Sequence, residues 1–177
     1  MSEGGANEKR QRTLSELAPA VRAWFGSTFG LPTPIQGAAW ETIHGGGSTL
    51  VIAPTGSGKT LAAFMHAIDR LFREPTPRAR NGKPQPGAGT RILYISPLKA
   101  LGADVRKNLN VPLEGIAALR ERRGDPPVTV TVGMRTGDTP ASERASLVRR
   151  PPDILITTPE SLYLMLTSKA RETLRGV

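Results

Sequence analysis

The stretch Ala53-Pro54-Thr55-Gly56-Ser57-Gly58-Lys59-Thr60 stands between two segments of different periodicity. Before it, residues 49 to 53 form a short apolar run bounded by turn residues, which predicts a buried parallel strand. After it, residues 59 to 72 carry apolar side chains at helical spacing. A strand, a glycine-rich turn and a helix, in that order, are the context that a phosphate-binding loop of the Walker A type requires.

Each residue type in this loop suits the binding of a nucleoside triphosphate. Gly56 and Gly58 let the backbone curve around a phosphate without a clash from a Cβ atom, and the amides of residues 56 to 60 form an anion nest at a helix N-terminus. Lys59 places a cation on the β- and γ-phosphates, and the Thr60 hydroxyl coordinates Mg²⁺. We therefore predict ATP and Mg²⁺ as cofactors, a catalytic role for Lys59 and Thr60, and a nucleotide site made by Thr55, Gly56, Ser57, Gly58, Lys59 and Thr60.

The alternation of strands and helices continues along the chain. Further strands are predicted at residues 91–95, 128–132 and 153–157, and helices at residues 15–29, 33–45, 98–108, 113–122, 140–149 and 159–167. Pro112 is expected to separate two of these helices, because proline lacks the amide that an inner turn needs. The pattern predicts an α/β fold with a parallel sheet flanked by helices and joined by right-handed crossovers.

Bulk composition limits the possibilities further. The 177 residues suit one domain, and 24 Lys and Arg against 15 Asp and Glu give a net charge of +9, which favours a polyanionic partner such as nucleic acid. Cysteine is absent, and His44 and His66 are too few for a metal cluster. The N-terminus lacks an apolar signal core, and no apolar run reaches the ~18 residues needed to cross a bilayer. We expect a cytoplasmic protein with no membrane partner.

Two segments look unable to form a packed structure. Residues 1–12 are polar and read as a disordered tail, so the predicted domain covers residues 13–177. The Pro/Gly-rich loop at residues 74–89 is basic through Arg78, Arg80 and Lys83. It either contacts nucleic acid or is a solvated insertion, and the sequence leaves both interpretations open.

Upstream of the phosphate-binding loop, Pro32-Thr33-Pro34-Ile35-Gln36 opens a helix, with Thr33 as N-cap and Pro34 at the first helical position. This segment resembles the Q motif of superfamily 2 helicases, in which a glutamine amide pairs with the adenine edge. A glutamine side chain both donates and accepts, so Gln36 can bond N6–H and N7 of adenine at once. We add Gln36 to the predicted nucleotide site.

Three further junctions follow predicted strands. Ser96-Pro97-Leu98-Lys99-Ala100-Leu101 resembles helicase motif Ia, and Thr157-Thr158-Pro159-Glu160-Ser161 resembles motif Ib. Arg135-Thr136-Gly137-Asp138-Thr139, followed by Arg144, is the third, in which Asp138 is open to a role in the turn alone. Helix N-termini at strand ends suit a nucleic-acid strand tracked along its phosphates. The predicted contacts are Ser96, Pro97, Lys99, Arg135, Thr136, Gly137, Thr157, Thr158, Pro159 and Glu160.

Taken together, residues 29–166 resemble the first motor domain of the large helicase-related (Lhr) proteins, which are superfamily 2 helicases. The resemblance implies a RecA-like P-loop NTPase fold. It also implies ATP hydrolysis coupled to translocation on single-stranded DNA, unwinding of DNA or RNA–DNA duplexes, a role in DNA repair, and a second RecA-like domain in the same full-length chain.

The resemblance also implies a segment that the sequence does not contain. The family pattern continues with Asp-Glu-Val-His, whose carboxylates hold Mg²⁺ and position the attacking water, and no such segment occurs in the 177 residues. We expect a sheet that stops before this Walker B strand, and a chain that binds ATP but hydrolyses it negligibly. Either the chain is the N-terminal part of a helicase, or it is a short non-catalytic protein that binds ATP or nucleic acid.

Overall fold

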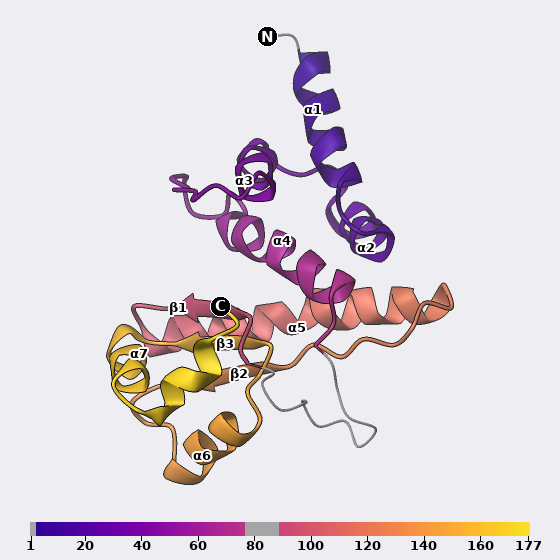
Figure 1. Cartoon of the computed structure of the whole chain (residues 1–177). Helices are drawn as coiled ribbons and strands as arrows, with labels where there is room; N and C mark the ends of the chain where they lie inside the picture. The colour runs from indigo at the N-terminus through magenta and orange to yellow at the C-terminus, as the bar shows by residue number, and fades with distance from the viewer. Residues whose placement is uncertain (1–2, 77–88) are drawn as a thin grey trace. The chain divides into compact units, whose positions relative to one another are not determined.

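The computed structural model describes residues 3–76 and 89–177, and it divides the chain into two compact units. Unit 1 comprises Met1–Glu74 and Gly115–Pro127, and unit 2 comprises Pro75–Glu114 and Val128–Val177. Figure 1 traces both along the chain. The basic residues predicted as possible nucleic-acid contacts, Arg78, Arg80 and Lys83, lie outside the described residues.

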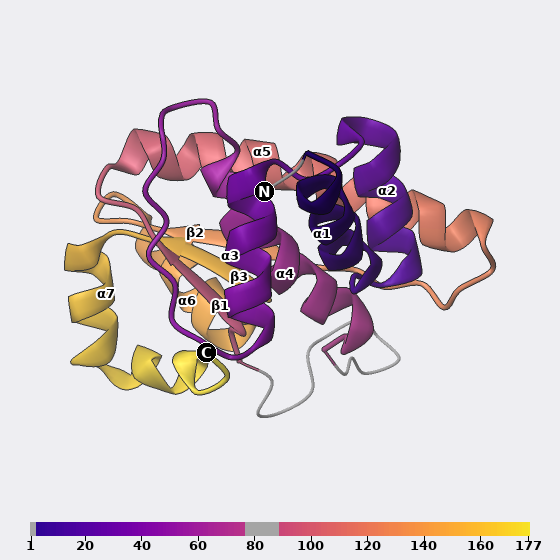
Figure 2. The same cartoon turned by 90° about the horizontal axis from the view of Figure 1, so that it is seen from above.

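Unit 1 is built from helices. They are α1 (Glu3–Ser15), α2 (Pro19–Phe29), α3 (Pro34–His44), α4 (Lys59–Arg73) and the last part of α5 (Lys99–Arg122). Helices α3 and α4 lie side by side (Figure 2), and the indole Nε1 of Trp40 donates to the Ala62 carbonyl at 3.0 Å. The α4 side chains Phe64, Met65 and Ile68 are buried, so α4 is the central element of this unit's core.

The N-terminal residues differ from the expectation of a disordered tail. Residues 3–15 form α1, which contacts α3, and Lys9 pairs with Glu41 at 2.7 Å. The buried residues Thr13 and Leu14 anchor its C-terminal end. Composition alone missed the helix because only its last turn has residues to bury.

The strand predicted at residues 49–53 is absent from the structure. Residues 47–54 have no regular secondary structure, and Leu50 and Ile52 are 85% and 81% exposed. A strand needs a neighbour for its N–H and C=O groups, and no strand of the described residues pairs with this segment. The prediction was wrong because a buried apolar run requires a partner strand that the local pattern cannot supply.

Unit 2 contains the sheet. Its three strands, β1 (Ile92–Ile95), β2 (Val132–Arg135) and β3 (Ile154–Thr157), are parallel in the order β1-β3-β2. Ile95 and Arg135 are both in register with Thr157, so the three strands end at one edge. The remaining elements are the first part of α5, α6 (Ala141–Arg149), α7 (Pro159–Leu166) and the 3-10 helix η1 (Lys169–Leu174).

Helices cover both faces of this sheet, as the α/β fold predicts. On one face Leu155 packs with Met165 of α7 and Ala170 of η1. On the other face Gly102 of α5 lies against Ile156, where an added Cβ would come within 3.2 Å of the Ile156 side chain. The parallel sheet flanked by helices is therefore confirmed.

Three predicted boundaries were wrong. The helix expected at residues 15–29 begins at Pro19, after a break at residues 16–18. The strand expected at residues 128–132 lies at Val132–Arg135, because its position is set by pairing with β3 and by bonds from Thr131 to the Asp153 carboxylate at 2.7 Å. Pro112 does not divide the helix: α5 runs unbroken from Lys99 to Arg122. The buried side chains Val105, Leu109, Leu113 and Ile116 form one stripe along it. Burial of this stripe outweighs the roughly 3 kcal/mol that an inner proline costs.

Candidate nucleotide and nucleic-acid sites

The nucleotide site predicted from the sequence lies in unit 1, between residues 53 and 60, at the start of α4. Gly56 and Gly58 have φ of +83° and +87°, in the region that favours glycine. Gly58 is the N-cap of α4, and a Cβ there would also collide with the Gln36 side chain. Both predicted glycines thus adopt conformations that other residues take only with strain.

The start of α3 holds this loop in place. Thr33 and Gln36 form a capping box, as the Thr33 amide donates to Gln36 Oε1 at 2.9 Å and the Gln36 amide to Thr33 Oγ1 at 3.4 Å. The same two side chains reach the loop: Thr33 Oγ1 donates to the Ser57 carbonyl at 3.2 Å, and Gln36 Nε2 to the Gly58 carbonyl at 3.3 Å. Gln36 is buried, and its amide is occupied at both ends.

The ammonium group of Lys59 faces the backbone of its own loop. Lys59 Nζ donates to the carbonyls of Ala53 at 2.5 Å and Pro54 at 2.6 Å. Thr55, Gly56 and Thr60 are exposed. The Ser57 hydroxyl is buried and has no hydrogen-bond partner among the described residues.

These features fit a triphosphate. A buried hydroxyl without a partner costs free energy unless a ligand satisfies it, and an ammonium resting on two neutral carbonyls gains a stronger partner in a phosphate oxygen. The exposed hydroxyl of Thr60, next to Lys59, is the group suited to Mg²⁺.

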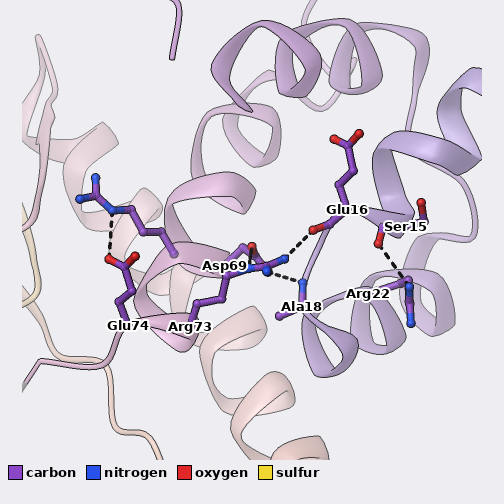
Figure 3. A network of polar contacts seen from close by, with 8 residues as sticks. Ser15, Glu16, Ala18, Arg22, Asp69, Arg73 and Glu74 are labelled. Atoms are coloured by element: carbon purple, nitrogen blue, oxygen red, sulfur yellow. Dashed lines mark hydrogen bonds and ion pairs between the residues drawn. The ribbon is translucent and has the colours of Figure 1, made fainter. Parts of the chain in front are cut away.

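A buried network anchors the far end of α4 (Figure 3). Asp69 is 5% exposed and accepts from the Ala18 amide at 2.6 Å and from Arg73 Nε at 2.5 Å. Arg73 also donates to the Glu16 carbonyl at 2.5 Å. These bonds tie the α1–α2 junction to the helix that follows the phosphate-binding loop. Sequence reasoning missed Asp69, because nothing in a helical repeat marks one acid as buried.

Two aromatic residues upstream of the Q-like segment, Trp24 and Phe25, belong to the core. Phe25 and Trp24 are buried, and Phe25 packs edge-on against Trp40 with ring centroids 5.2 Å apart. The rings of His44 and His66 are likewise 5.6 Å apart, and burial, followed by the charge of His44, lowers the pKa of His66 below its ordinary value of 6.5. The described residues contain no group of three or more His, Asp or Glu side chains arranged to hold a metal.

The residues predicted to contact nucleic acid come together in unit 2, at the edge where the three strands end. Ser96 follows β1, Thr136 follows β2 and Thr158 follows β3. The Ser96 amide donates to the Thr157 carbonyl at 2.8 Å, and the Thr157 hydroxyl to the Arg135 carbonyl at 2.8 Å. The parallel register thus places all three junctions on one edge of the sheet.

The side chains at this edge fall into two groups. Ser96, Thr136, Thr157 and Thr158 are buried, whereas Pro97, Lys99, Gly137, Pro159 and Glu160 are exposed. Thr158 is the N-cap of α7 and Pro159 begins it, as predicted, although the Thr158 side chain makes no capping bond. The Ser96 hydroxyl donates to the Leu98 carbonyl at 2.8 Å, and α5 begins at Lys99, one residue after the predicted start at residue 98.

Charges at this edge are mostly positive. Burial, followed by the charge of Arg144, lowers the pKa of the half-buried Arg135. Arg144 donates to the carbonyls of Thr139 at 2.7 Å and Gly137 at 2.6 Å, so it holds the turn after β2. Lys99 pairs with Asp138, and this hydrogen bond, then the charge of Lys99, lowers the pKa of the exposed Asp138.

Comparison with known proteins agrees with this arrangement. A family model described as DEAD/DEAH box helicase matches residues 33–177. The Escherichia coli Lhr helicase/uracil glycosylase is 61% identical over 91% of this chain, and the ATP-dependent helicase Lhr-Core protein 2 of Thermococcus barophilus is 43% identical over 91%. The chain spans 10% and 18% of the lengths of these two relatives.

A solved structure supports the same assignment. The Mycobacterium smegmatis helicase Lhr bound to single-stranded DNA and AMP-PNP matches 93% of this chain, and 20% of that one, with a TM-score of 0.83 and 53% identity. No helix of the described residues has the length and apolar character to cross a membrane. The strand-end edge, the RecA-like fold and these matches lead to one conclusion: the chain belongs to the DEAD/DEAH box helicase family and resembles its Lhr members over most of its length.

Proposed function

We propose that this chain is the ATP-binding and nucleic-acid-binding part of a superfamily 2 helicase. In the full-length protein it would couple ATP hydrolysis to translocation along single-stranded DNA, in the cytoplasm and in the service of DNA repair. RNA–DNA duplexes are a second substrate class, and a second RecA-like domain in the same chain would complete the motor. The relative solved with DNA and AMP-PNP supports both ligand classes.

The proposal that the chain binds ATP rests on polar groups of the phosphate-binding loop that lack a strong hydrogen-bond partner. Ser57 Oγ is buried without a partner among the described residues, and Lys59 rests on two carbonyls of its own loop. The β- and γ-phosphates would satisfy both groups, with the amides of residues 56–60 around them. Mg²⁺, held by Thr60, would neutralise charge on the phosphates.

Gln36 would read the base. Its amide already contacts the Gly58 carbonyl and the Thr33 amide, so adenine must take over at least one of these bonds. Recognition of the base would then be linked to the position of the phosphate-binding loop, since the same side chain serves both.

Nucleic acid would lie along the strand-end edge of unit 2. Lys99 and Arg135 supply cations there, and the backbone at Pro97, Gly137 and Pro159 is exposed enough to approach phosphates. Such contacts are to the sugar–phosphate backbone of the nucleic acid rather than to its bases. The strand-end edge would therefore bind without sequence preference.

The 177-residue chain itself is expected to bind ATP without turning it over. Phosphoryl transfer needs a carboxylate that positions water and a trans arginine worth ~10³ or more in rate, and the sequence contains no Asp-Glu-Val-His segment.

The test is titration of the chain with a fluorescent ATP analogue and Mg²⁺, followed by phosphate release with and without oligo(dT). Lys59→Ala should weaken binding roughly tenfold or more, as a charge-assisted bond is lost. Lys169→Ala, which removes an exposed lysine on η1, is the matched control and should bind normally. Equal binding by both variants would contradict the nucleotide site, and DNA-stimulated hydrolysis that depends on Lys59 would contradict the absence of turnover.

A further inference from the structure

Asp138, like Glu160, is an exposed acid at the strand-end edge, in a place that we assign to phosphates. It lies at the tip of the turn after β2, and its carboxylate pairs with Lys99 at the start of α5. Both side chains are open to solvent, Asp138 at 73% and Lys99 at 55%. The pair therefore joins two of the three junctions that the sheet brings together.

The turn does not need this carboxylate in order to form. The Thr136 amide donates to Thr139 Oγ1 at 2.9 Å, and the Thr139 amide to the Thr136 carbonyl at 3.2 Å. Arg144 closes the turn from the other side through the carbonyls of residues 137 and 139. The hydrogen bonds that close this turn thus come from Thr139 and Arg144, while the Asp138 side chain is directed to Lys99.

The other cations at this edge differ from Lys99. Arg144 is committed to backbone carbonyls. Arg135 has no ion pair among the described residues, and the neighbouring charge of Arg144 makes its surroundings positive. A phosphate can therefore bind Arg135 without displacing an acidic side chain. To bind Lys99 it has to displace the Asp138 carboxylate.

We propose that Asp138 is an internal competitor for Lys99, which weakens the grip of this edge on nucleic-acid phosphates until the phosphate displaces it. The proposal rests on the proposed function, since it assumes that Lys99 contacts the strand. An exposed ion pair contributes little to stability, so a phosphate can displace the carboxylate. A motor that steps along a nucleic-acid strand has to release that strand in each cycle. The Asp138 carboxylate, next to Lys99, would favour this release.

The test is fluorescence anisotropy of a labelled 20-nucleotide oligo(dT) with the full 177-residue chain. Asp138→Asn keeps a residue suited to turns and removes the charge, and it should tighten binding about two- to fivefold at low salt. The gain should shrink in ~0.5 M salt, because exposed charges are screened. Glu172→Gln is the matched control: it neutralises an exposed acid of the same unit that pairs with Arg175 at 2.6 Å, and it should change affinity little.

A double-mutant cycle separates competition from general repulsion. In a Lys99→Ala background, the gain in oligo(dT) affinity from Asp138→Asn should fall to the small change seen with the control Glu172→Gln. A full gain in that background, or no gain in the unmodified chain, would overturn the proposal. If Lys99→Ala itself leaves binding unchanged, the proposed phosphate contact of Lys99 fails, and this inference with it. Asp138→Ser, with melting temperatures for each variant, guards against an effect of misfolding.

Discussion

At the scale of single residues, the phosphate-binding loop shows how one position can be fixed for two independent reasons. Gly58 has a φ of +87°, and the space beside it is filled by the Gln36 amide. The sequence motif predicts a glycine here because the backbone has to curve around a phosphate without a clash from a Cβ atom. The structure adds that the Gln36 amide occupies the place where a Cβ would stand, so the residue proposed to bind the base and the phosphate-binding loop constrain one another.

Gly58→Ala should therefore destabilise unit 1 by about 1–3 kcal/mol, from the left-handed backbone and the displaced amide together. Gly26→Ala is the matched control, since Gly26 lies inside α2 with open space around its Cα. That change should stabilise by about 0.5–1 kcal/mol, as alanine favours a helix. The readout is urea unfolding followed by tryptophan emission, because both tryptophans, Trp24 and Trp40, are buried in unit 1. Similar shifts for the two variants would contradict the argument.

At the scale of helices and strands, long-range pairing explains where the sequence misleads. The helices α3, α4, α6 and α7 lie close to their predicted bounds, because caps, prolines and apolar spacing are local signals. The strand at residues 49–53 and the exact place of β2 were wrong, because both depend on a neighbouring strand. Pro112 misled for a similar reason: the buried stripe of α5 is a tertiary effect that outweighs a local one.

The same distinction applies to the candidate site. The motifs predict Lys59, Gln36 and the three strand-end junctions, because each has a characteristic spacing. Spacing could not give the pairing of Lys99 with Asp138, since 39 residues separate them and only the register of the sheet brings their junctions together. Nor could it show that Thr157 is buried and bonded to β2.

Helix α4 and its C-cap residue Glu74 contain two acid–arginine pairs, each with its partners four residues apart. The two pairs should differ sharply in their contribution to the free energy of unfolding. Asp69 is buried and holds the Ala18 amide as well as Arg73, whereas Glu74 pairs with Arg70 at 3.6 Å with both side chains about two-thirds exposed. Asp69→Ala leaves a buried amide and Arg73 unmatched, and should cost about 2–4 kcal/mol. Asp69→Asn should cost less, because its oxygen can still accept from Ala18.

Glu74→Gln is the control on the same helix, and its effect should stay within about 0.5 kcal/mol. Urea unfolding followed by tryptophan emission measures all three variants. An Asp69→Ala loss no larger than that of Glu74→Gln would mean that the network in Figure 3 does not anchor the helix.

At the scale of the whole molecule, the two predicted ligands belong to different units. The phosphate-binding loop lies in unit 1 and the strand-end edge in unit 2, and the chain passes between the units at residues 74–75, 114–115 and 127–128. Unit 1 contains the two tryptophans, whereas Tyr94 and Tyr163 lie in unit 2. Each unit thus has its own candidate site and its own spectroscopic probe.

Hydrogen exchange read by mass spectrometry should resolve these sites. An ATP analogue with Mg²⁺ should slow exchange at residues 53–62, where the loop amides would bond phosphate, and oligo(dT) should slow it at residues 96–99, 136–139 and 158–161. Lys59→Ala should abolish the first protection and leave the second, because Lys59 is in unit 1. Protection by oligo(dT) confined to unit 1, or its loss in Lys59→Ala, would contradict the assignment of the nucleic-acid edge to the ends of β1, β2 and β3.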